Sequence, residues 1–275
     1  MDINFKKNMR YCDKKNNRII IEGGSPTPEF WDEQSIIKEL KKHIESARNE
    51  RFVSNITAKF IKPDKTKKIL EGGCGRGHFV YSLKYNGYDA YGVDFAKETI
   101  KKINLVMPDL KVNIGDVRHL DFPDNFFDGY WSLGVIEHFF EGYDEILSEM
   151  KRVIKKNGYL FLTFPHMSFL RKLKMKMGLY PPFNANVFDM NLFYHFALDP
   201  AKVKSDLEKL GFRMVYSRQL EGIKGLKDEI SILNKPLQKI YNSQNFFVRA
   251  LNYFGAKILA PFSAHAILQV FKRNQ

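Results

Sequence analysis

The residues best placed to do chemistry lie in one stretch, KILEGGCGRGHF, from Lys68 to Phe79. A short apolar strand ends there on the carboxylate of Glu71, and glycines follow at positions 72, 73, 75 and 77. Glycine adopts backbone angles that other residues avoid, and its lack of a Cβ lets a ligand lie against the main chain. Helical spacing resumes after Gly77, so the stretch predicts a strand, a ligand-binding loop and a helix whose first N–H groups face the ligand.

The spacing of the glycines excludes two better-known loops. A dinucleotide-binding G-x-G-x-x-G would need glycine at position 78 or 80, where the sequence has histidine and valine. A P-loop would need Gly-Lys-Ser/Thr, which does not occur in the chain. The pattern present is E-x-G-x-G-x-G, at Glu71, Gly73, Gly75 and Gly77.

Two aspartates follow later strands and are candidates for nucleoside binding. Asp94 ends a predicted strand about 20 residues beyond the loop, where doubly wound folds place an acidic group on ribose hydroxyls. A carboxylate accepts hydrogen bonds from both hydroxyls, which suits it to this position. Asp116 follows the strand predicted over 110–114, where it could accept from the exocyclic amine of adenine. The alternatives are a helix cap for Asp94 and a cap or turn residue for Asp116.

A second informative stretch, LDFPDNFFDGYWSLGVIEHF, runs from Leu120 to Phe139. It contains a turn, a strand and a break at Gly134, after which helical spacing resumes. The E-x-G-x-G-x-G loop resembles motif I of the class I S-adenosylmethionine-dependent methyltransferases. L-x-F-P-x-x-x-F-D followed by G-V-I-E-H resembles motif IV of the small-molecule members of that family. The resemblance covers about Glu29 to Lys272.

The resemblance implies an α/β fold with a Rossmann-like sheet of seven strands. Five strands would be parallel and two would form an antiparallel edge pair, with helices on both faces of the sheet. We expect an irregular N-terminal arm over residues 1–28 and a methyltransferase domain over 29–275. Helical, cap-like insertions are expected after the fifth and sixth strands, at about 166–195 and 220–263.

The same resemblance implies that S-adenosyl-L-methionine is the cofactor and indicates where it binds. The family places the acidic residue of motif I beneath the methionine moiety and packs the glycine loop against the cofactor. The later motif positions contact the ribose, the adenine and the methionine in turn. The residues so implied in cofactor binding are Glu71, Gly73, Gly75, Gly77, Asp94, Phe95, Asp116, Val117, Leu133 and Gly134.

Methyl transfer from a sulfonium is an in-line displacement, so an enzyme gains chiefly by aligning the nucleophile, the methyl carbon and the sulfur. A base is needed only when the acceptor must lose a proton. His138 is the nearest candidate base for a hydroxyl acceptor, and a structural histidine is the alternative interpretation. His166, Tyr194 and His195 lie in or beside the first insertion and are candidate acceptor-binding residues. No metal is expected, because Leu133 replaces the first glutamate of the family's metal-assisting E-x-x-x-E-H motif.

The charge balance favours anionic partners. Lys and Arg number 44 against 31 Asp and Glu, a net charge of +13, which suits nucleic acid, an anionic membrane surface or a phosphorylated substrate. The two cysteines indicate neither a disulfide framework nor a metal site. The chain shows no apolar leader region and no apolar stretch long enough to span a bilayer. These features predict a cytoplasmic protein, with peripheral contact to an anionic membrane as an option.

The two insertions bear on the acceptor. The first alternates Lys and Arg with Leu, Met and Phe, which suits a helix on an anionic membrane surface, and the second adds apolar helices. The leading hypothesis is O-methylation of a small acceptor that is lipid-linked or contains sugar. The alternative is that both insertions are ordinary caps of the domain, with their basic residues on a solvated rim. An RNA-modifying methyltransferase and a catalytically silent, cofactor-binding partner subunit stay open. The lack of an appended RNA-binding module makes nucleic acid the weaker choice.

Overall fold

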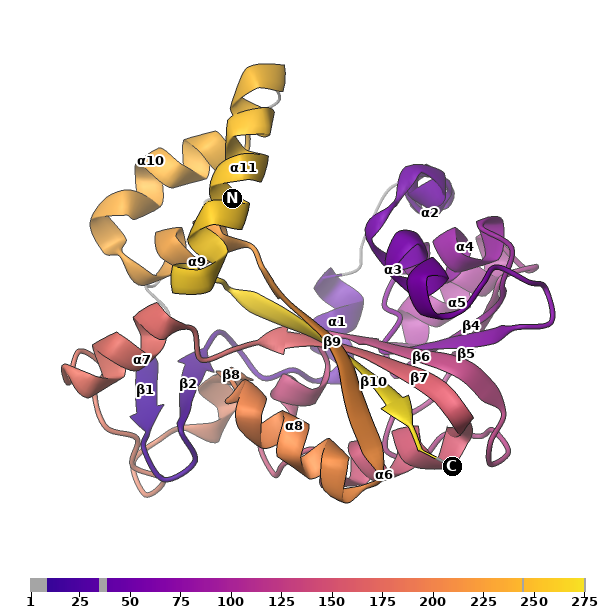
Figure 1. Cartoon of the computed structure of the whole chain (residues 1–275), viewed down its shortest axis with the longest axis horizontal. Helices are drawn as coiled ribbons and strands as arrows, with labels where there is room; N and C mark the ends of the chain where they lie inside the picture. Colours follow the sequence, from indigo (N-terminus) through magenta and orange to yellow (C-terminus); the bar gives the residue numbers. More distant parts are fainter. Residues whose placement is uncertain (1–8, 35–38, 244, 275) are drawn as a thin grey trace. The chain divides into compact units, whose positions relative to one another are not determined.

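A seven-stranded sheet with strand order β5-β4-β3-β6-β7-β10-β9 organises the fold, with β9 and β10 forming an antiparallel edge pair (Figure 1). The computed structural model describes residues 9–34, 39–243 and 245–274. The strands are β3 (Lys68–Gly72), β4 (Asp89–Asp94), β5 (Lys111–Ile114), β6 (Phe127–Leu133), β7 (Ile154–Pro165), β9 (Phe212–Leu220) and β10 (Ala266–Arg273). The predicted Rossmann-like fold with seven strands is confirmed.

The central strands form because they are apolar on both faces, as parallel strands covered by helices must be. β3 pairs in parallel with β4 and β6, and β4 pairs in parallel with β5. Leu70 in β3 and Trp131 in β6 are fully buried. Gly72 in β3 leaves room for the hydroxyl of Tyr130 on β6, which a Cβ at that position would strike. This parallel arrangement brings the carboxyl ends of β3, β4, β5 and β6 to one edge of the sheet.

The chain forms two compact units. The larger unit comprises Pro26–Leu162, Asp206–Tyr216 and Val270–Gln275, and the smaller comprises Met1–Ser25, Thr163–Ser205 and Ser217–Gln269. The helices of the larger unit are α1 (Pro28–Gln34), α2 (Leu40–Ser46), α3 (Phe52–Phe60), α4 (His78–Tyr85), α5 (Lys97–Val106) and α6 (Asp144–Val153), with 3-10 turns η1 (Ala47–Asn49) and η2 (Ile136–His138). Helix α8 (Pro200–Lys209) leads into β9.

The smaller unit contains a second sheet that the sequence did not reveal. Strands β1 (Arg10–Asp13) and β2 (Arg18–Glu22) form an antiparallel hairpin, and β2 also pairs with β8 (Phe193–Ala197). The prediction of an irregular arm over residues 1–28 is therefore wrong for these residues, while residues 1–8 lie outside the described part. The hairpin is stabilised by pairing with a strand about 170 residues away, and no local pattern reports such a partner.

The helices of the smaller unit occupy the two predicted insertions. They are α7 (Phe169–Lys176) and the turn η3 (Met190–Leu192) in the first, and α9 (Gly222–Glu229), α10 (Ser231–Tyr241) and α11 (Phe246–Ser263) in the second. Ser168 caps the start of helix α7, and its hydroxyl accepts a hydrogen bond from the N–H of Arg171. Within the described residues, no helix combines the length and the apolar composition that crossing a membrane requires.

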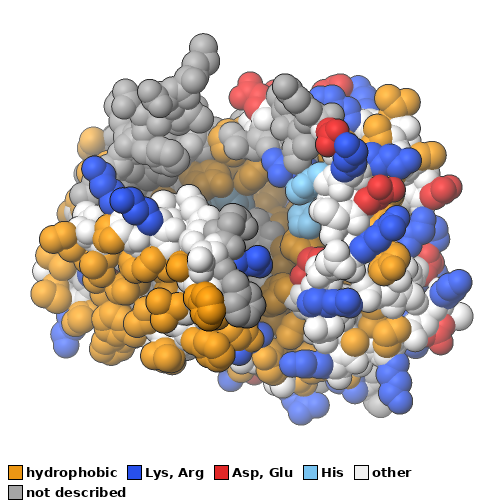
Figure 2. Space-filling model, turned by 90° about the horizontal axis from the view of Figure 1, so that it is seen from above, with side chains coloured by type: hydrophobic (Ala, Val, Ile, Leu, Met, Phe, Trp, Pro, Cys, Tyr) orange, Lys and Arg blue, Asp and Glu red, His pale blue; other side chains and the backbone are white. Residues whose placement is uncertain are grey.

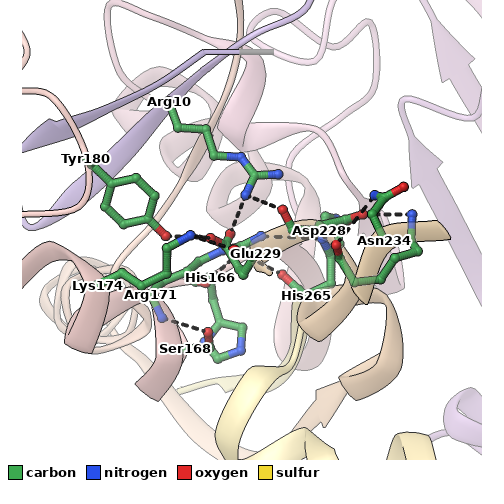
Figure 3. Close-up of polar contacts among 11 residues, drawn as sticks. Arg10, His166, Ser168, Arg171, Lys174, Tyr180, Asp228, Glu229, Asn234 and His265 are labelled. Atoms are coloured by element: carbon green, nitrogen blue, oxygen red, sulfur yellow. Dashed lines mark hydrogen bonds and ion pairs between the residues drawn. The ribbon is translucent and has the colours of Figure 1, made fainter. Parts of the chain in front are cut away.

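A buried cluster of charges joins these helices to the hairpin within the smaller unit. Glu229 of α9 accepts from Arg171 Nε at 2.9 Å, from Lys174 Nζ at 2.9 Å and from the hydroxyl of Tyr180 at 2.5 Å, and Arg10 Nη1 lies 2.8 Å from it (Figure 3). The side chains of Glu229 and Arg171 are both 1% exposed. Two of the basic residues that suggested a membrane-facing α7 therefore point inward and hold the unit together.

Candidate functional site

The glycine loop after β3 is held open by the neighbouring strand β4. Gly73, Gly75 and Gly77 all have positive φ angles, of 75°, 48° and 71°. The N–H groups of Gly73 and Cys74 donate to the carbonyl of Val93 at 2.8 and 3.0 Å. A Cβ on Gly73 would lie 2.5 Å from Val135, whereas one on Gly75 would meet nothing within 4 Å. Gly73 is thus required by packing and by its positive φ angle, and Gly75 by its positive φ angle alone.

Asp94, at the carboxyl end of β4, connects this loop to the start of α5. Its Oδ2 accepts from the N–H of Gly75 at 2.7 Å, and its Oδ1 accepts from the N–H of Ala96 at 2.9 Å. The residue is buried, and that burial raises the pKa of its carboxyl, while the two N–H groups act in the opposite direction. Each carboxylate oxygen keeps lone-pair capacity for another donor, such as a ribose hydroxyl.

The alternative role for Asp94, capping the next helix, is taken by a residue that sequence reasoning missed. Asp32 of α1 accepts from the N–H of Glu98 at 3.2 Å and from the N–H and hydroxyl of Thr99 at 2.7 and 2.8 Å. It therefore satisfies the first N–H groups of α5 from a helix more than 60 residues earlier. An i-to-i+3 capping pattern cannot reveal this contact, because the cap comes from a distant part of the sequence.

Glu71, the last residue of β3 before the glycines, has a buried carboxyl group, and one of its oxygens accepts no hydrogen bond. The residue is 2% exposed, and its Oε2 has no hydrogen-bond partner. Burial and the nearby Asp94 carboxylate raise its pKa well above the usual range, and the N–H of Val80 partly offsets this. A buried polar atom without a partner is costly, so a cationic or hydrogen-bond-donating ligand group would stabilise the ionised form of Glu71.

Asp116 and Val117 follow β5, as predicted. Arg118 binds the Asp116 carboxylate with its side chain, with an Nη2–Oδ2 distance of 2.6 Å, and donates to it from the backbone N–H at 2.9 Å. These contacts lower the pKa of Asp116 against the opposing effect of its partial burial. Val117 is buried beside it. An adenine amine would therefore meet a carboxylate that is already ionised and fixed in position.

The turn after β6 contains Leu133, Gly134, Glu137 and His138. Gly134 has φ of 70°, and a Cβ there would lie 3.3 Å from Oε1 of Glu137. Glu137 is 2% exposed and its Oε2 has no partner, so burial raises its pKa to about 8. In the sequence, Glu137 belongs both to the G-V-I-E-H stretch and to the incomplete metal-assisting motif, and neither predicts a buried carboxyl without a partner. Its position in G-V-I-E-H, directly beside a required glycine, was the available signal.

Substituting Glu137 with glutamine is expected to flatten the dependence of stability on pH. The wild-type carboxyl ionises near 4.5 when unfolded but only near pH 8 when folded, so the folded state loses stability as pH rises between these values. The free energy of unfolding of the variant should exceed that of the wild type by an amount that grows with pH, on the order of 3–5 kcal/mol by pH 8. Urea unfolding at a series of pH values measures this difference.

The exposed neighbour Glu141 provides the control for that measurement. Glu141→Gln removes one carboxyl from the same loop without removing a buried one, and it should reproduce the wild-type slope. Equal slopes for wild type and Glu137→Gln would contradict the raised pKa.

His138, the candidate base, lies against an aromatic side chain of α1. The rings of His138 and Trp31 meet edge to face with centroids 5.1 Å apart, and Phe30 packs on Trp31 in the same manner. The side chains of Trp31 and His138 are both half-buried. Phe95, predicted beside the adenine, is half-buried after β4. Helix α1 therefore contributes both Trp31 and Asp32 to the region around the predicted site.

The larger unit contains every residue predicted to bind the cofactor, together with His138. The three predicted acceptor-binding residues belong to the smaller unit. His166 follows β7 and is 2% exposed, neither ring nitrogen has a partner, and its burial lowers its pKa to about 3. Tyr194 and His195 lie on β8, with ring centroids 4.7 Å apart, and His195 pairs with Ile21 of β2. Among the described residues, no three His, Cys, Asp or Glu side chains are grouped to hold a metal ion.

Comparison with known proteins gives the site its context. Residues 70–162 match a family model described as a methyltransferase domain. A search of curated protein sequences found no match.

Solved structures with the same fold include three of archaeal origin. One is the PH0226 protein of Pyrococcus horikoshii, with 18% identity and a TM-score of 0.53, covering 87% of this chain and 93% of that one. Another is a SAM-dependent methyltransferase of Archaeoglobus fulgidus, with 22% identity and a TM-score of 0.53, covering 82% and 95%. A third is a complex of the Haloferax volcanii Trm112 methyltransferase activator with a methyltransferase, with 12% identity and a TM-score of 0.56, covering 89% and 98%.

The family match covers the stretch from β3 to β7, which includes the glycine loop, Asp94, Asp116 and the G-V-I-E-H turn. The strand order of the sheet and the similarity to the solved structures extend the agreement beyond that stretch. Residues 70–162 thus match a methyltransferase domain, and the described chain has the Rossmann-like fold of these solved structures.

Proposed function

We propose that the protein transfers a methyl group from S-adenosylmethionine to a hydroxyl oxygen of a small acceptor, and that the acceptor is lipid-linked or contains sugar. The observation that carries the proposal is a buried acceptor without a partner, Oε2 of Glu71, at the carboxyl end of β3 and two residues before the loop glycines. The open space at the Cβ position of Gly75 supports it. These features fit a ligand with a cationic methionine end that lies against main chain.

The residues of the larger unit divide the binding task. Glu71 faces the charged methionine end, and Leu133 and Gly134 border it. Asp94 accepts from the ribose hydroxyls while its other lone pairs hold Gly75 and Ala96. Phe95, Asp116 and Val117 surround the adenine. Most of these groups are held in place by packing or hydrogen bonds, so binding costs little reorganisation.

The bound cofactor would supply an electrophilic methyl carbon attached to a positively charged sulfur. With the cofactor bound, the acceptor oxygen would bond to that carbon while the carbon–sulfur bond broke, and the bonding electron pair would stay with sulfur. The proton of the acceptor hydroxyl passes to the imidazole of His138. Trp31 restricts the orientation of that ring through the edge-to-face contact, which favours a single productive geometry.

The acceptor class is inferred from the smaller unit. Large apolar side chains of α7 and α11 are exposed there, among them Phe169 at 59% and Ile258 at 77%. A lipid-linked acceptor would match such a surface better than a fully polar small molecule does. To test this, the purified protein is incubated with methyl-labelled S-adenosylmethionine and an extract of the cells that produce it, and the label is then partitioned.

Label in the organic-solvent phase supports the proposal. Label in nuclease-sensitive material would contradict the proposal. It would indicate that the acceptor is RNA and that the basic surface binds it. Cofactor binding by calorimetry without any transferred label would contradict the proposed activity and indicate a partner subunit.

Replacing His138 with asparagine is expected to lower the rate of label transfer by about 100-fold or more, because the acceptor hydroxyl loses its base. The dissociation constant for S-adenosylmethionine should change little. The matched control is His119→Asn, since His119 is an exposed histidine of the same unit. A His138 variant that transfers label at the wild-type rate, or that loses cofactor affinity and rate together, would point to a structural histidine instead.

A further inference from the structure

Helix α11 carries an apolar stripe that faces away from its own unit. Leu251, Phe254 and Ile258 are spaced by three and four residues, so they share one side of the helix. Their exposed fractions are 64%, 61% and 77%. Figure 2 shows hydrophobic side chains gathered over part of the face that it draws. A helix normally buries such a stripe against its protein core.

The apolar surface continues onto the neighbouring helices of the smaller unit. Ile232 of α10 is 84% exposed. At the other end of α11, the ring of Phe262 lies 5.7 Å from that of Phe169 on α7, which is 59% exposed. Exposed apolar residues that occur singly need no explanation, whereas a surface continuous over several helices marks an interaction site.

The charges carried by α10 and α11 themselves are all of one sign. From Ile230 to Gln275 the sequence contains no Asp or Glu. Its α10 and α11 segments contain four exposed basic residues, Lys235, Lys239, Arg249 and Lys257. Within the described part of the chain, none of these four forms an ion pair with a carboxylate. An apolar stripe flanked by unneutralised cations is complementary to an anionic lipid surface.

The acidic residues of the adjoining helix α9 do not alter this balance, because each already has a cationic partner. Asp228 pairs with Lys227 at 2.8 Å, and Glu229 is surrounded by Arg10, Arg171 and Lys174. The two basic residues of α7 that face Glu229, Arg171 and Lys174, form ion pairs with it inside the unit. The positive surface therefore includes α10 and α11, and α7 adds the exposed Lys172 and Lys176 beside its apolar side chains.

We propose that the face formed by α10 and α11 docks on the surface of an anionic lipid bilayer. Leu251, Phe254 and Ile258 enter the boundary between headgroups and acyl chains, and the lysines and Arg249 contact the anionic headgroups. Docking itself does not require methyl transfer. Its use in presenting a lipid-linked acceptor to the enzyme rests on the proposed function.

The test is cosedimentation of the full chain with vesicles. Mixed phosphatidylglycerol–phosphatidylcholine vesicles should bind the wild type, and binding should weaken as salt is added because the headgroup contacts are screened. Vesicles of phosphatidylcholine alone should bind the wild type at least about tenfold more weakly. The triple variant Leu251→Ser/Phe254→Ser/Ile258→Ser should lose about tenfold or more of the binding to mixed vesicles, because it removes the buried apolar area.

Two controls keep the result specific. Leu105→Ser removes an apolar side chain that is 82% exposed on α5, and it should bind mixed vesicles as the wild type does. Calorimetric titration with S-adenosylmethionine should give the same dissociation constant for wild type and triple variant, which separates a failure of docking from a failure of the proposed function.

Three results would overturn the proposal. One is equal sedimentation with anionic and neutral vesicles, and another is wild-type binding by the triple variant. The third is a wild-type dimer that the triple variant converts to a monomer, because the stripe would then be covered by a second copy of the chain.

Discussion

Replacing Asp94 with alanine is expected to weaken the binding of S-adenosylmethionine by at least about 100-fold, measured by calorimetry. Two losses add. The variant lacks the carboxylate that is proposed to accept from the ribose hydroxyls, and each hydrogen bond to a charged group contributes about 1.5–3 kcal/mol. The N–H of Gly75 also loses its acceptor at 2.7 Å, so the glycine loop is no longer held in its open conformation.

Asparagine at position 94 should not rescue binding. Both oxygens of Asp94 accept from backbone N–H groups, and an amide would place its own donor against one of them. Asp89 provides the control, since it lies at the other end of β4 and pairs with Lys111 at 2.6 Å on a partly exposed surface. Asp89→Ala should leave the cofactor affinity unchanged. If Asp94→Ala bound the cofactor as tightly as the wild type, the placement of the ribose at β4 would be wrong.

Replacing Glu229 with alanine is expected to have the largest effect on stability, on the order of 3–5 kcal/mol in the free energy of unfolding of the smaller unit. The substitution leaves Arg171, whose side chain is 1% exposed, as a buried cation without a carboxylate. Lys174, Arg10 and the hydroxyl of Tyr180 lose the same acceptor. Thermal unfolding and hydrogen exchange in α7 and α9 would report the loss.

The same cluster determines how this contribution depends on pH. Arg171 and Arg10 lower the pKa of Glu229 to about 2 from its ordinary 4.5, against the opposing effect of burial. Since the folded pKa is depressed, the stabilisation is complete above pH 4.5 and is lost as the pH falls toward 2. Glu98→Ala, which removes an exposed partner of Lys101, should change stability little. A Glu229 variant that unfolds like the wild type would contradict the structural role of the cluster.

The cofactor half of the fold could be predicted because its signals are local. The strand of Ile69 and Leu70, the glycines after Glu71 and the break at Gly134 each follow from a few adjacent residues. A buried parallel strand reads as an apolar run, and a positive φ requires glycine or a close substitute. The order of these signals along the chain resembles that of a known family, and this resemblance implied the seven-stranded sheet.

The functional surroundings of the site were less predictable, since their residues meet across long sequence separations. Asp32 capping α5 and Trp31 meeting His138 depend on where α1 packs. The raised pKa of Glu137 depends on how completely the turn after β6 buries its carboxyl. Charge and burial at these positions depend on how the structure packs. The spacing of apolar residues along the sequence does not reveal this packing.

The sequence by itself indicated a Rossmann-like sheet of seven strands, because glycine positions and apolar runs are local signals. The residues predicted to hold the cofactor came from its resemblance to a known family. Only the tertiary structure decided which cations are available to a partner. Arg171 and Lys174 look in the sequence like a membrane-facing pair but are neutralised inside the unit by Glu229. The exposed cations of α10 and α11 form no ion pair with a carboxylate among the described residues, and their own segment from Ile230 to Gln275 contains no Asp or Glu. Charge pairing is a matter of distances in space, and the fold sets those distances.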